Sequence, residues 1–551
     1  MSIKRFGSVA FGKFFGGAMA LALAGCATFD STGDMAGMGE TGSAPLLTTT
    51  LGPVRGTTSG DGEVMVFRGV RYGASTEGLR FQEARDPAPW TAPRDATRFG
   101  ADCPQRPSGE VPVFASWVND LPRSEDCLFL NVWTRGMNDG KKRPIMVWLH
   151  GGGYVTGSGS SHGYDGTRLA QRGDVVVVTI NHRLNGFGYL YLGGVSNDPK
   201  YAHSGNLGSL DAVKALEWVR DNAAAIGGDP DNVTIFGESG GAAKVSTLMA
   251  MESADGLFDR AIAQSGSMSL AGFEPRLASA LTQDIFKTAG LEPGDIEALA
   301  ALSTEEYVAV LMKSRTRAAY FRPVVDGSSL KRQPFAPDAT PLSADIPLLV
   351  GTNRTEMRLQ AGLADPGNFS LTWDQLPAKL EAIVGDADVE RIIAGMRAAH
   401  PEADASEIFF QTATFQNYRG TALRQAERKS AQNRAPVYMY RLDWETPVEG
   451  GRLKTPHALD IAFVFDNVAR STSITGSGPE QQRLADLMSD AWIAFAKTGN
   501  PNTSALPQWP RYTQANRATM IFDTQPEVVV DPDMEERQLL QDALSEGRAT
   551  D

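Results

Sequence analysis

The stretch that decides the fold is Asn232-Val233-Thr234-Ile235-Phe236-Gly237-Glu238-Ser239-Gly240-Gly241. Its first half is an apolar, β-branched run, which predicts a buried strand, and residues 242–251 after it are compatible with a helix. Residues 237–241 fit the pattern G-x-S-x-G, in which the serine occupies a sharp, strained turn between strand and helix. Glycines flank the serine because a side chain there would clash. The stretch therefore predicts that Ser239 Oγ is presented at a helix N-terminus, whose partial positive charge favours developing negative charge.

Similar strands are predicted on both sides of this turn. Residues 144–149 and 175–180 are continuous apolar runs, typical of parallel strands buried on both faces. A helical pattern over residues 210–225 lies between the second and third runs, and this order predicts a right-handed parallel crossover. Further strands are expected at 347–351, 437–442 and 519–522, and helical insertions that cap the sheet at 275–320 and 370–432.

These patterns predict an α/β protein of the α/β-hydrolase fold, with a large, mostly parallel central sheet, helices on both faces and helical insertions. The length of 551 residues alone would suggest several domains. Past residue 50, however, we find no linker, charge block or repeat, so we expect a single domain over residues 48–551. The net charge of −13 disfavours nucleic acid as a partner, because an acidic chain repels phosphate backbones.

Residues 1–26 have the pattern of a targeting segment. Lys4, Arg5 and Lys13 precede a short apolar region at residues 16–25, which falls short of the roughly 20 apolar residues of a membrane span. Leu23-Ala24-Gly25-Cys26 resembles the lipobox of bacterial lipoproteins, in which the cysteine is acylated; the alternative is an ordinary secretory signal with a coincidental cysteine. Residues 27–47 are small, polar and Gly-rich, and are expected to form a flexible tether. We therefore expect an exported protein, lipid-anchored at the cell envelope and sorted to the outer membrane.

A second glycine-rich motif, His150-Gly151-Gly152-Gly153, follows the first predicted strand. Its backbone N–H groups could converge on a substrate oxygen, and such preorganised donors stabilise a tetrahedral oxyanion. The α/β-hydrolase fold has half of its oxyanion hole at this place, although a simple Gly-rich turn is the alternative. His150 itself is expected to be structural.

An activated serine needs a base, and in this fold the chain order is serine, acid, histidine. Only His400 and His457 follow Ser239. His400 lies in a polar helical stretch and is expected to face solvent, so His457, before an apolar segment, is the candidate base. Many carboxylates lie between Ser239 and His457; Glu356 is favoured because it follows a predicted strand.

The sequence has no zinc, calcium or phosphate-loop signature, so we expect no metal and no cofactor. Besides Cys26 the chain has only Cys103 and Cys127. In an oxidising compartment these two thiols can pair, and the alternative is a pair of buried free thiols.

At this point the chain resembles the type-B carboxylesterase family, which includes cholinesterases and bacterial para-nitrobenzyl esterases. The resemblance covers residues 52–522. The motifs that carry it are Ser124-Glu125-Asp126-Cys127-Leu128, residues 148–153, Thr179-Ile180-Asn181-His182-Arg183-Leu184, residues 228–241, Ala263-Gln264-Ser265-Gly266, Pro323-Val324-Val325-Asp326-Gly327 and residues 492–502.

The resemblance implies specific roles. Ser239 matches the nucleophile, Glu356 the acid and His457 the base; Gly152, Gly153 and Gly240 match the oxyanion donors, and Cys103 and Cys127 match the family's first disulfide. Two positions depart from the family: Met357 replaces a glycine, and Gly240 replaces an alanine, which we expect to matter little because the N–H is kept. Trp117 has the spacing of a cation-binding tryptophan in cholinesterases, and its alternative role is to pack a variable loop.

We therefore expect a serine carboxylic ester hydrolase that acts on a small-molecule ester through an acyl-enzyme intermediate. Two alternatives stay open: a catalytically silent, cholinesterase-like binding or adhesion module, because fold does not imply function, and an amidase or thioesterase on the same triad. Covalent labelling of Ser239 by an organophosphate separates the first from an enzyme, and parallel ester and amide kinetics separate the second.

Overall fold

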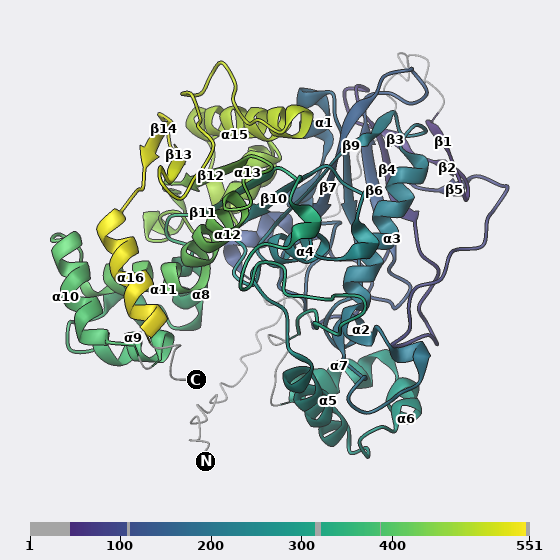
Figure 1. Ribbon diagram of the computed structural model, residues 1–551. Helices are drawn as coiled ribbons and strands as arrows, with labels where there is room; N and C mark the ends of the chain where they lie inside the picture. The colour runs from purple at the N-terminus through teal and green to yellow at the C-terminus, as the bar shows by residue number, and fades with distance from the viewer. Residues whose placement is uncertain (1–43, 107–110, 315–320, 386, 547–551) are drawn as a thin grey trace, which may run out of the picture. The chain divides into compact units, whose positions relative to one another are not determined.

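A mixed sheet of eleven strands runs through the described part of the chain (Figure 1). The structure is a computed structural model that describes residues 44–106, 111–314, 321–385 and 387–546. In spatial order the strands are β14 (Glu527–Val530), β13 (Ala518–Phe522), β12 (Val437–Leu442), β11 (Leu348–Asn353), β10 (Arg260–Gln264), β9 (Gly228–Glu238), β7 (Arg143–Leu149), β8 (Val176–Ile180), β6 (Phe129–Thr134), β4 (Met65–Arg71) and β3 (Thr57–Thr58). All neighbours from β13 to β8 pair in parallel, and the outer strands pair antiparallel. The predicted α/β fold with a mostly parallel sheet is therefore confirmed.

The order of the central strands creates a topological switch point at their carboxyl ends. β8 pairs with one side of β7 and β9 with the other, so that Val147 is opposite both Val178 and Ile235. The chain thus leaves β7 in one direction and returns on its other side, which is the switch point where open α/β sheets bind ligands. His150 follows β7 and Ser239 follows β9, so both glycine-rich motifs open at this switch point.

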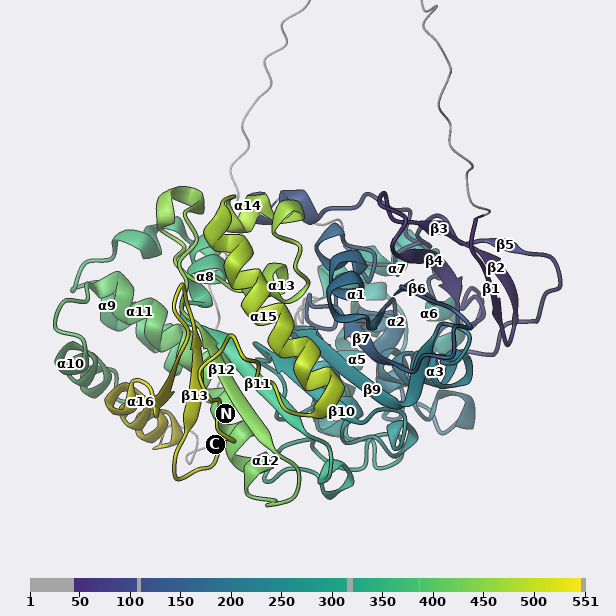
Figure 2. The ribbon, with the colours of Figure 1, turned by 90° about the horizontal axis from the view of Figure 1, so that it is seen from above.

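Helices cover both faces of the sheet (Figures 1 and 2). Alternate residues of β7 point to opposite faces: Ile145 and Val147 belong to a core shared with α3 and α4, and Met146 and Trp148 to a core shared with α1 and α15. The helices are α1 (Thr167–Gly173), α2 (Asn185–Tyr189), α3 (Leu207–Asn222), α4 (Gly240–Leu248), α5 (Pro275–Ala289), α6 (Ile296–Ala301), α7 (Thr304–Lys313), α8 (Met357–Ala364), α9 (Leu376–Val384), α10 (Val389–Ala399), α11 (Ala405–Thr414), α12 (Gly420–Ser430), α13 (Leu459–Val464), α14 (Thr472–Thr475), α15 (Pro479–Thr498) and α16 (Met534–Glu546).

The two predicted insertions are helical, but they do not simply cap the sheet. α5, α6 and α7 pack with α2 in a cluster of their own, in which Leu281, Leu299 and Tyr307 meet Phe187 (Figure 1). The end of the second insertion packs on strands: α12 lies against β11 and β12, and the π-helical segment Phe415–Arg419 before it lies against β11. By contrast, α9, α10 and α11 pack on one another and on α8 and α16. The reason is that each insertion contains several amphipathic helices that bury their apolar faces against each other. Residues 315–320 lie outside the described residues.

A small second sheet is formed by segments near the start of the described chain. It contains β1 (Leu46–Thr49), β2 (Gly52–Arg55) and β5 (Arg94–Asp95). β1 begins before the predicted end of the tether at residue 47, because Leu47 is buried in the core and Thr50 N donates to Asn222 Oδ1 at 2.8 Å. Cys26 and the rest of the targeting segment and tether, up to residue 43, lie outside the described residues.

The chain from Ala44 onward groups into one compact unit. Among the described residues, no helix has the length and apolarity needed to cross a membrane. Within the same ranges, no group of three or more His, Cys, Asp or Glu side chains is arranged to hold a metal ion.

Candidate active site

Ser239 occupies the strained turn that the sequence predicts. β9 ends at Glu238 and α4 begins at Gly240, and Ser239 between them has φ 57° and ψ −121°. A Cβ at Gly241 would lie 1.9 Å from the Leu149 carbonyl oxygen, so this flank of the turn must be glycine. The Ser239 N–H donates to the Gln264 carbonyl at 2.8 Å, and the serine stays half-buried. The backbone thus fixes a serine hydroxyl at the carboxyl edge of the sheet.

Glu356 and His457 are in direct contact. Glu356 follows β11 and precedes α8, and His457 lies in the loop between β12 and α13. The carboxylate Oε2 lies 2.6 Å from His457 Nδ1, and the His457 N–H donates to the Glu356 carbonyl at 3.3 Å. Tyr418 lies against the imidazole with the ring centroids 4.7 Å apart. These contacts fix the orientation of the imidazole ring.

The Glu356 carboxylate has further partners that the sequence analysis did not assign. Its Oε1 accepts hydrogen bonds from Ser265 Oγ at 2.5 Å and from the Asn353 N–H at 2.7 Å. Glu356 is fully buried, so these donors replace the water that a carboxylate would otherwise need. Ser265 follows β10 directly; the motif Ala263-Gln264-Ser265-Gly266 was the available signal, but nothing in the sequence gave Ser265 a role. Met357, where the family has glycine, begins α8 and leaves the acid in place.

The second imidazole nitrogen faces Glu238, the residue before Ser239. His457 Nε2 lies 3.2 Å from Glu238 Oε1. Glu238 is fully buried, and burial raises its pKa while the positive charge of His457 opposes that rise. Burial lowers the pKa of His457, but Glu238 and Glu356 outweigh it, and the net effect is a raised pKa. The structure therefore brings Glu356, His457 and the residue adjoining Ser239 together, and the serine–histidine hydrogen bond itself is part of the proposal below.

The glycines of the second motif lie beside this group. Gly152 is exposed and Gly153 half-buried, and both have positive φ, 88° and 63°, which suits glycine. Among the described residues, none accepts a hydrogen bond from either N–H. Gly240 is the first residue of α4, so its N–H has no acceptor within the helix. Three donors thus remain available for an anionic oxygen.

Gly240 lies against the backbone of the second glycine-rich motif. A Cβ at this position would lie 2.2 Å from the Gly153 carbonyl oxygen and 2.4 Å from Gly153 Cα. An alanine, usual in the family, would force the two backbones apart here. The glycine therefore allows the loop of Gly152 and Gly153 to touch α4. This contact argues against the expectation that the difference matters little, and its effect on activity is a prediction for the Gly240→Ala variant.

Two other predicted residues take structural positions. His150 is buried and stacks on His182, with the rings nearly parallel and their centroids 4.7 Å apart. His400 does not simply face solvent: it ends α10, and its Nε2 lies 2.8 Å from a carboxylate oxygen of Glu536 on α16. His457, which contacts Glu356, therefore remains the candidate base.

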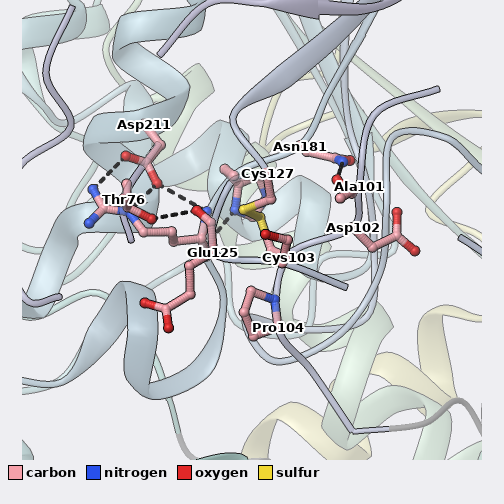
Figure 3. The surroundings of a disulfide bond; sticks show 12 residues. Thr76, Ala101, Asp102, Cys103, Pro104, Glu125, Cys127, Asn181 and Asp211 are labelled. Carbon is pink, nitrogen blue, oxygen red and sulfur yellow. Dashed lines mark hydrogen bonds and ion pairs between the residues drawn. A yellow bond between two sulfur atoms is a disulfide. The ribbon is translucent and has the colours of Figure 1, made fainter. Parts of the chain in front are cut away.

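The two cysteines are joined (Figure 3). Cys103 and Cys127 form a disulfide with a sulfur–sulfur distance of 2.01 Å and a sequence separation of 24 residues. The neighbouring backbone is held as well, since Asn181 Nδ2 donates to the Ala101 carbonyl at 3.0 Å (Figure 3). The closed loop carries Trp117.

Trp117 packs rather than lining an open site. Its side chain is only 6% exposed, its ring stacks on Phe114 with centroids 5.3 Å apart, and its Nε1 donates to Ser471 Oγ at 2.9 Å. The packing role, rather than a cation-binding role, therefore fits this structure.

Comparisons with known proteins agree with this geometry. Residues 43–540 match the carboxylesterase family. The para-nitrobenzyl esterase of Bacillus subtilis is 36% identical over 90% of this chain and 98% of its own length, and the phenmedipham hydrolase of Pseudarthrobacter oxydans is 33% identical over 87% and 94%. The crystal structure of the carboxylesterase EST55 from Geobacillus stearothermophilus shares 40% identity, with a TM-score of 0.79 over 90% of this chain and all of that one. This chain therefore belongs to the carboxylesterase family and is an enzyme that hydrolyses esters.

Proposed function

We propose that the chain is a serine carboxylic ester hydrolase that works through an acyl-enzyme intermediate, with Ser239, His457 and Glu356 as its triad. The observation that carries the proposal is the buried 2.6 Å contact between His457 Nδ1 and Glu356 Oε2, at the sheet edge where the turn presents Ser239. Glu356 holds the tautomer in which the Nδ1–H group donates a hydrogen bond to Oε2, which leaves Nε2 to act as base.

In the first half of the reaction, His457 Nε2 takes the proton of Ser239 Oγ as Oγ attacks the ester carbonyl. The carbonyl electrons move to oxygen, and the N–H groups of Gly152, Gly153 and Gly240 stabilise this oxyanion. The carbonyl reforms, the bond to the alcohol oxygen breaks, and the alcohol leaves with the proton from His457. Water then attacks the acyl-enzyme by the same route and releases the acid.

Glu238 competes with the serine for Nε2. A proton between His457 Nε2 and Glu238 Oε1 gives an imidazolium–carboxylate pair, and an imidazolium cannot accept the serine proton. The active form is therefore the one in which Nε2 is unprotonated, so activity should rise with pH.

The proposal is tested with a small aryl ester. Ser239→Ala should abolish hydrolysis of p-nitrophenyl acetate and labelling by an organophosphate, with an unchanged thermal melt. Ser370→Ala, at an exposed serine, is the control and should keep both. Full hydrolysis by Ser239→Ala would refute the assignment of the nucleophile.

The same preparation addresses the remaining alternatives. Stoichiometric labelling of Ser239 would exclude a catalytically silent module, because such a module has no activated serine. Hydrolysis of a p-nitrophenyl ester and of the p-nitroanilide of the same acid, measured in parallel, decides between an esterase and an amidase. We expect the ester to be the better substrate.

We also propose that the enzyme is lipid-anchored through Cys26 at the cell envelope, facing outward from the cytoplasm. The support is the order of charged region, short apolar region and Leu23-Ala24-Gly25-Cys26 in the sequence. Wild type should partition into detergent and incorporate labelled fatty acid, whereas Cys26→Ser should do neither. Equal labelling of both would overturn the proposed site.

A further inference from the structure

A buried lysine connects the two halves of the oxyanion hole. Lys244 lies on α4, one turn after Gly240, and is only 2% exposed. Its Nζ donates a hydrogen bond to the carbonyl oxygen of His150 at 2.9 Å. His150 follows β7 and leads directly into Gly151, Gly152 and Gly153. The lysine thus ties the glycine loop after β7 to the helix after β9.

The lysine is costly to bury. Within the described residues the structure records no ion pair for Lys244, whose Nζ lies 5.6 Å from the ring centroid of Tyr154. Burial accordingly lowers its pKa to about 7. An apolar side chain of similar volume would fill the space without this penalty. Because burying the charge destabilises the fold, we infer that the hydrogen bond from Lys244 Nζ to the His150 carbonyl has a role beyond packing.

The neighbouring imidazoles do not take over this role. His150 and His182 stack beside the lysine, and the pKa of each is lowered well below its ordinary value by burial and then by the charge of Lys244. Both rings therefore stay neutral. The Nδ1 atom of His150 lies 2.9 Å from the Gly151 carbonyl, and that of His182 lies 3.0 Å from the Arg183 carbonyl, so each Nδ1 makes a local backbone contact.

The tie matters because the donors come from two segments. Gly152 and Gly153 belong to the loop and Gly240 to the helix, and Gly240 allows the two backbones to touch. A shift of about 1 Å between catalytic groups can cost roughly 10²-fold in rate. We propose that Lys244 is a positioning residue that fixes the glycine loop to α4, so that all three N–H groups point at one oxyanion. This inference rests on the proposed function.

The test compares two buried lysines. Lys244→Met removes the hydrogen bond at similar volume, and Lys244→Gln keeps a neutral donor. Lys429→Met is the matched control, because Lys429 is fully buried on α12. Its Nζ donates to the carbonyls of Ser343 at 2.9 Å and Ala344 at 2.7 Å. These two residues precede β11, at the amino ends of the strands. Each variant is measured with p-nitrophenyl acetate and with a trifluoromethyl ketone, which forms an anionic tetrahedral adduct on an active serine.

Lys244→Met should lower kcat by about 10²-fold with KM within about twofold, and weaken the trifluoromethyl ketone by a similar factor. Lys244→Gln should recover part of both losses. Lys429→Met should lower the melting temperature and leave kcat per labelled serine unchanged. If Lys244 were merely structural, Lys244→Met would not lower kcat while leaving KM unchanged and Lys429→Met unaffected in kcat.

Other outcomes overturn the inference. It fails if Lys244→Met keeps kcat within twofold, if Lys429→Met loses kcat equally, or if neither Lys244 variant accumulates as folded protein, which would make the role structural. Failure of the proposed function looks different: wild type itself would not be labelled by the organophosphate at Ser239. The two failures are therefore distinguishable.

Discussion

Replacing Gly240 by the alanine that is usual in the family should damage this enzyme. The added Cβ would lie 2.2 Å from the Gly153 carbonyl oxygen, about 1 Å closer than such atoms normally approach. The contact is with backbone, so no side chain can move aside, and the loop must shift away from α4. Loss of one oxyanion donor costs about 10²–10³-fold in turnover, and a displaced donor should lose at least the lower part of this range. We therefore expect kcat to fall by about 10²-fold.

The assay is steady-state hydrolysis of p-nitrophenyl acetate, with active sites counted by organophosphate labelling. Gly60→Ala is the control, because a Cβ there meets nothing within 4 Å and the position is exposed. KM and the far-UV spectrum should stay near wild type, since the shift is local. Unchanged kcat in Gly240→Ala would refute the argument that the close contact between loop and helix sets the donor geometry.

Three further results are expected. Because neighbouring carboxylates raise the pKa of His457, kcat/KM should fall as the pH drops through that raised pKa. Glu238→Gln should lower the pKa of His457 and extend activity to more acidic pH. A pH profile that does not move in this variant would contradict the ion pair between His457 and Glu238. Ser265→Ala removes a donor to the triad carboxylate and should reduce kcat about tenfold with little change in KM, as measured per labelled active site. Cys103→Ala combined with Cys127→Ala opens a loop of 24 residues and should cost about 3 kcal/mol of unfolding free energy in denaturant titration, whereas an unshifted midpoint would argue against the bond.

The sequence predicts the central strands of the sheet because each of them is a continuous apolar run. β7, β8, β9, β11, β12 and β13 were all expected, and each is buried on both faces, β9 from Val233 onward. β10 was not predicted, because Arg260–Gln264 contains a charged residue, a glutamine and two alanines and so lacks a continuous β-branched run. The packing of the insertions escaped for another reason: helical periodicity shows that a face is apolar but not which partner covers it.

The site divides in the same way. The turn at Ser239 and the glycines after β7 are local motifs, so the sequence places them. His457 was reached by chain order. Glu356 was favoured among many carboxylates because it follows a predicted strand, and the resemblance then matched it to the acid. Neither has a local motif, because partners distant in the chain leave no local signal. Glu238 and Lys244 were missed, since what makes them notable is burial, and a charged residue in a sequence is expected to be exposed.

The strand order has a consequence for how such enzymes diversify. β7, β9, β10, β11 and β12 are consecutive neighbours, and each is followed by one element of the chemistry: the glycine loop, the serine, the carboxylate's partner Ser265, the acid and the histidine. Neighbouring strands lie about 4.8 Å apart, so the hydrogen bonding between the strands sets the spacing of these groups. The α5–α7 cluster and the disulfide-closed loop do not contribute to this strand pairing, so their sequences can vary without changing that spacing. Enzymes that share this strand order can therefore differ widely in their helical insertions and still hold the same groups at the same spacing.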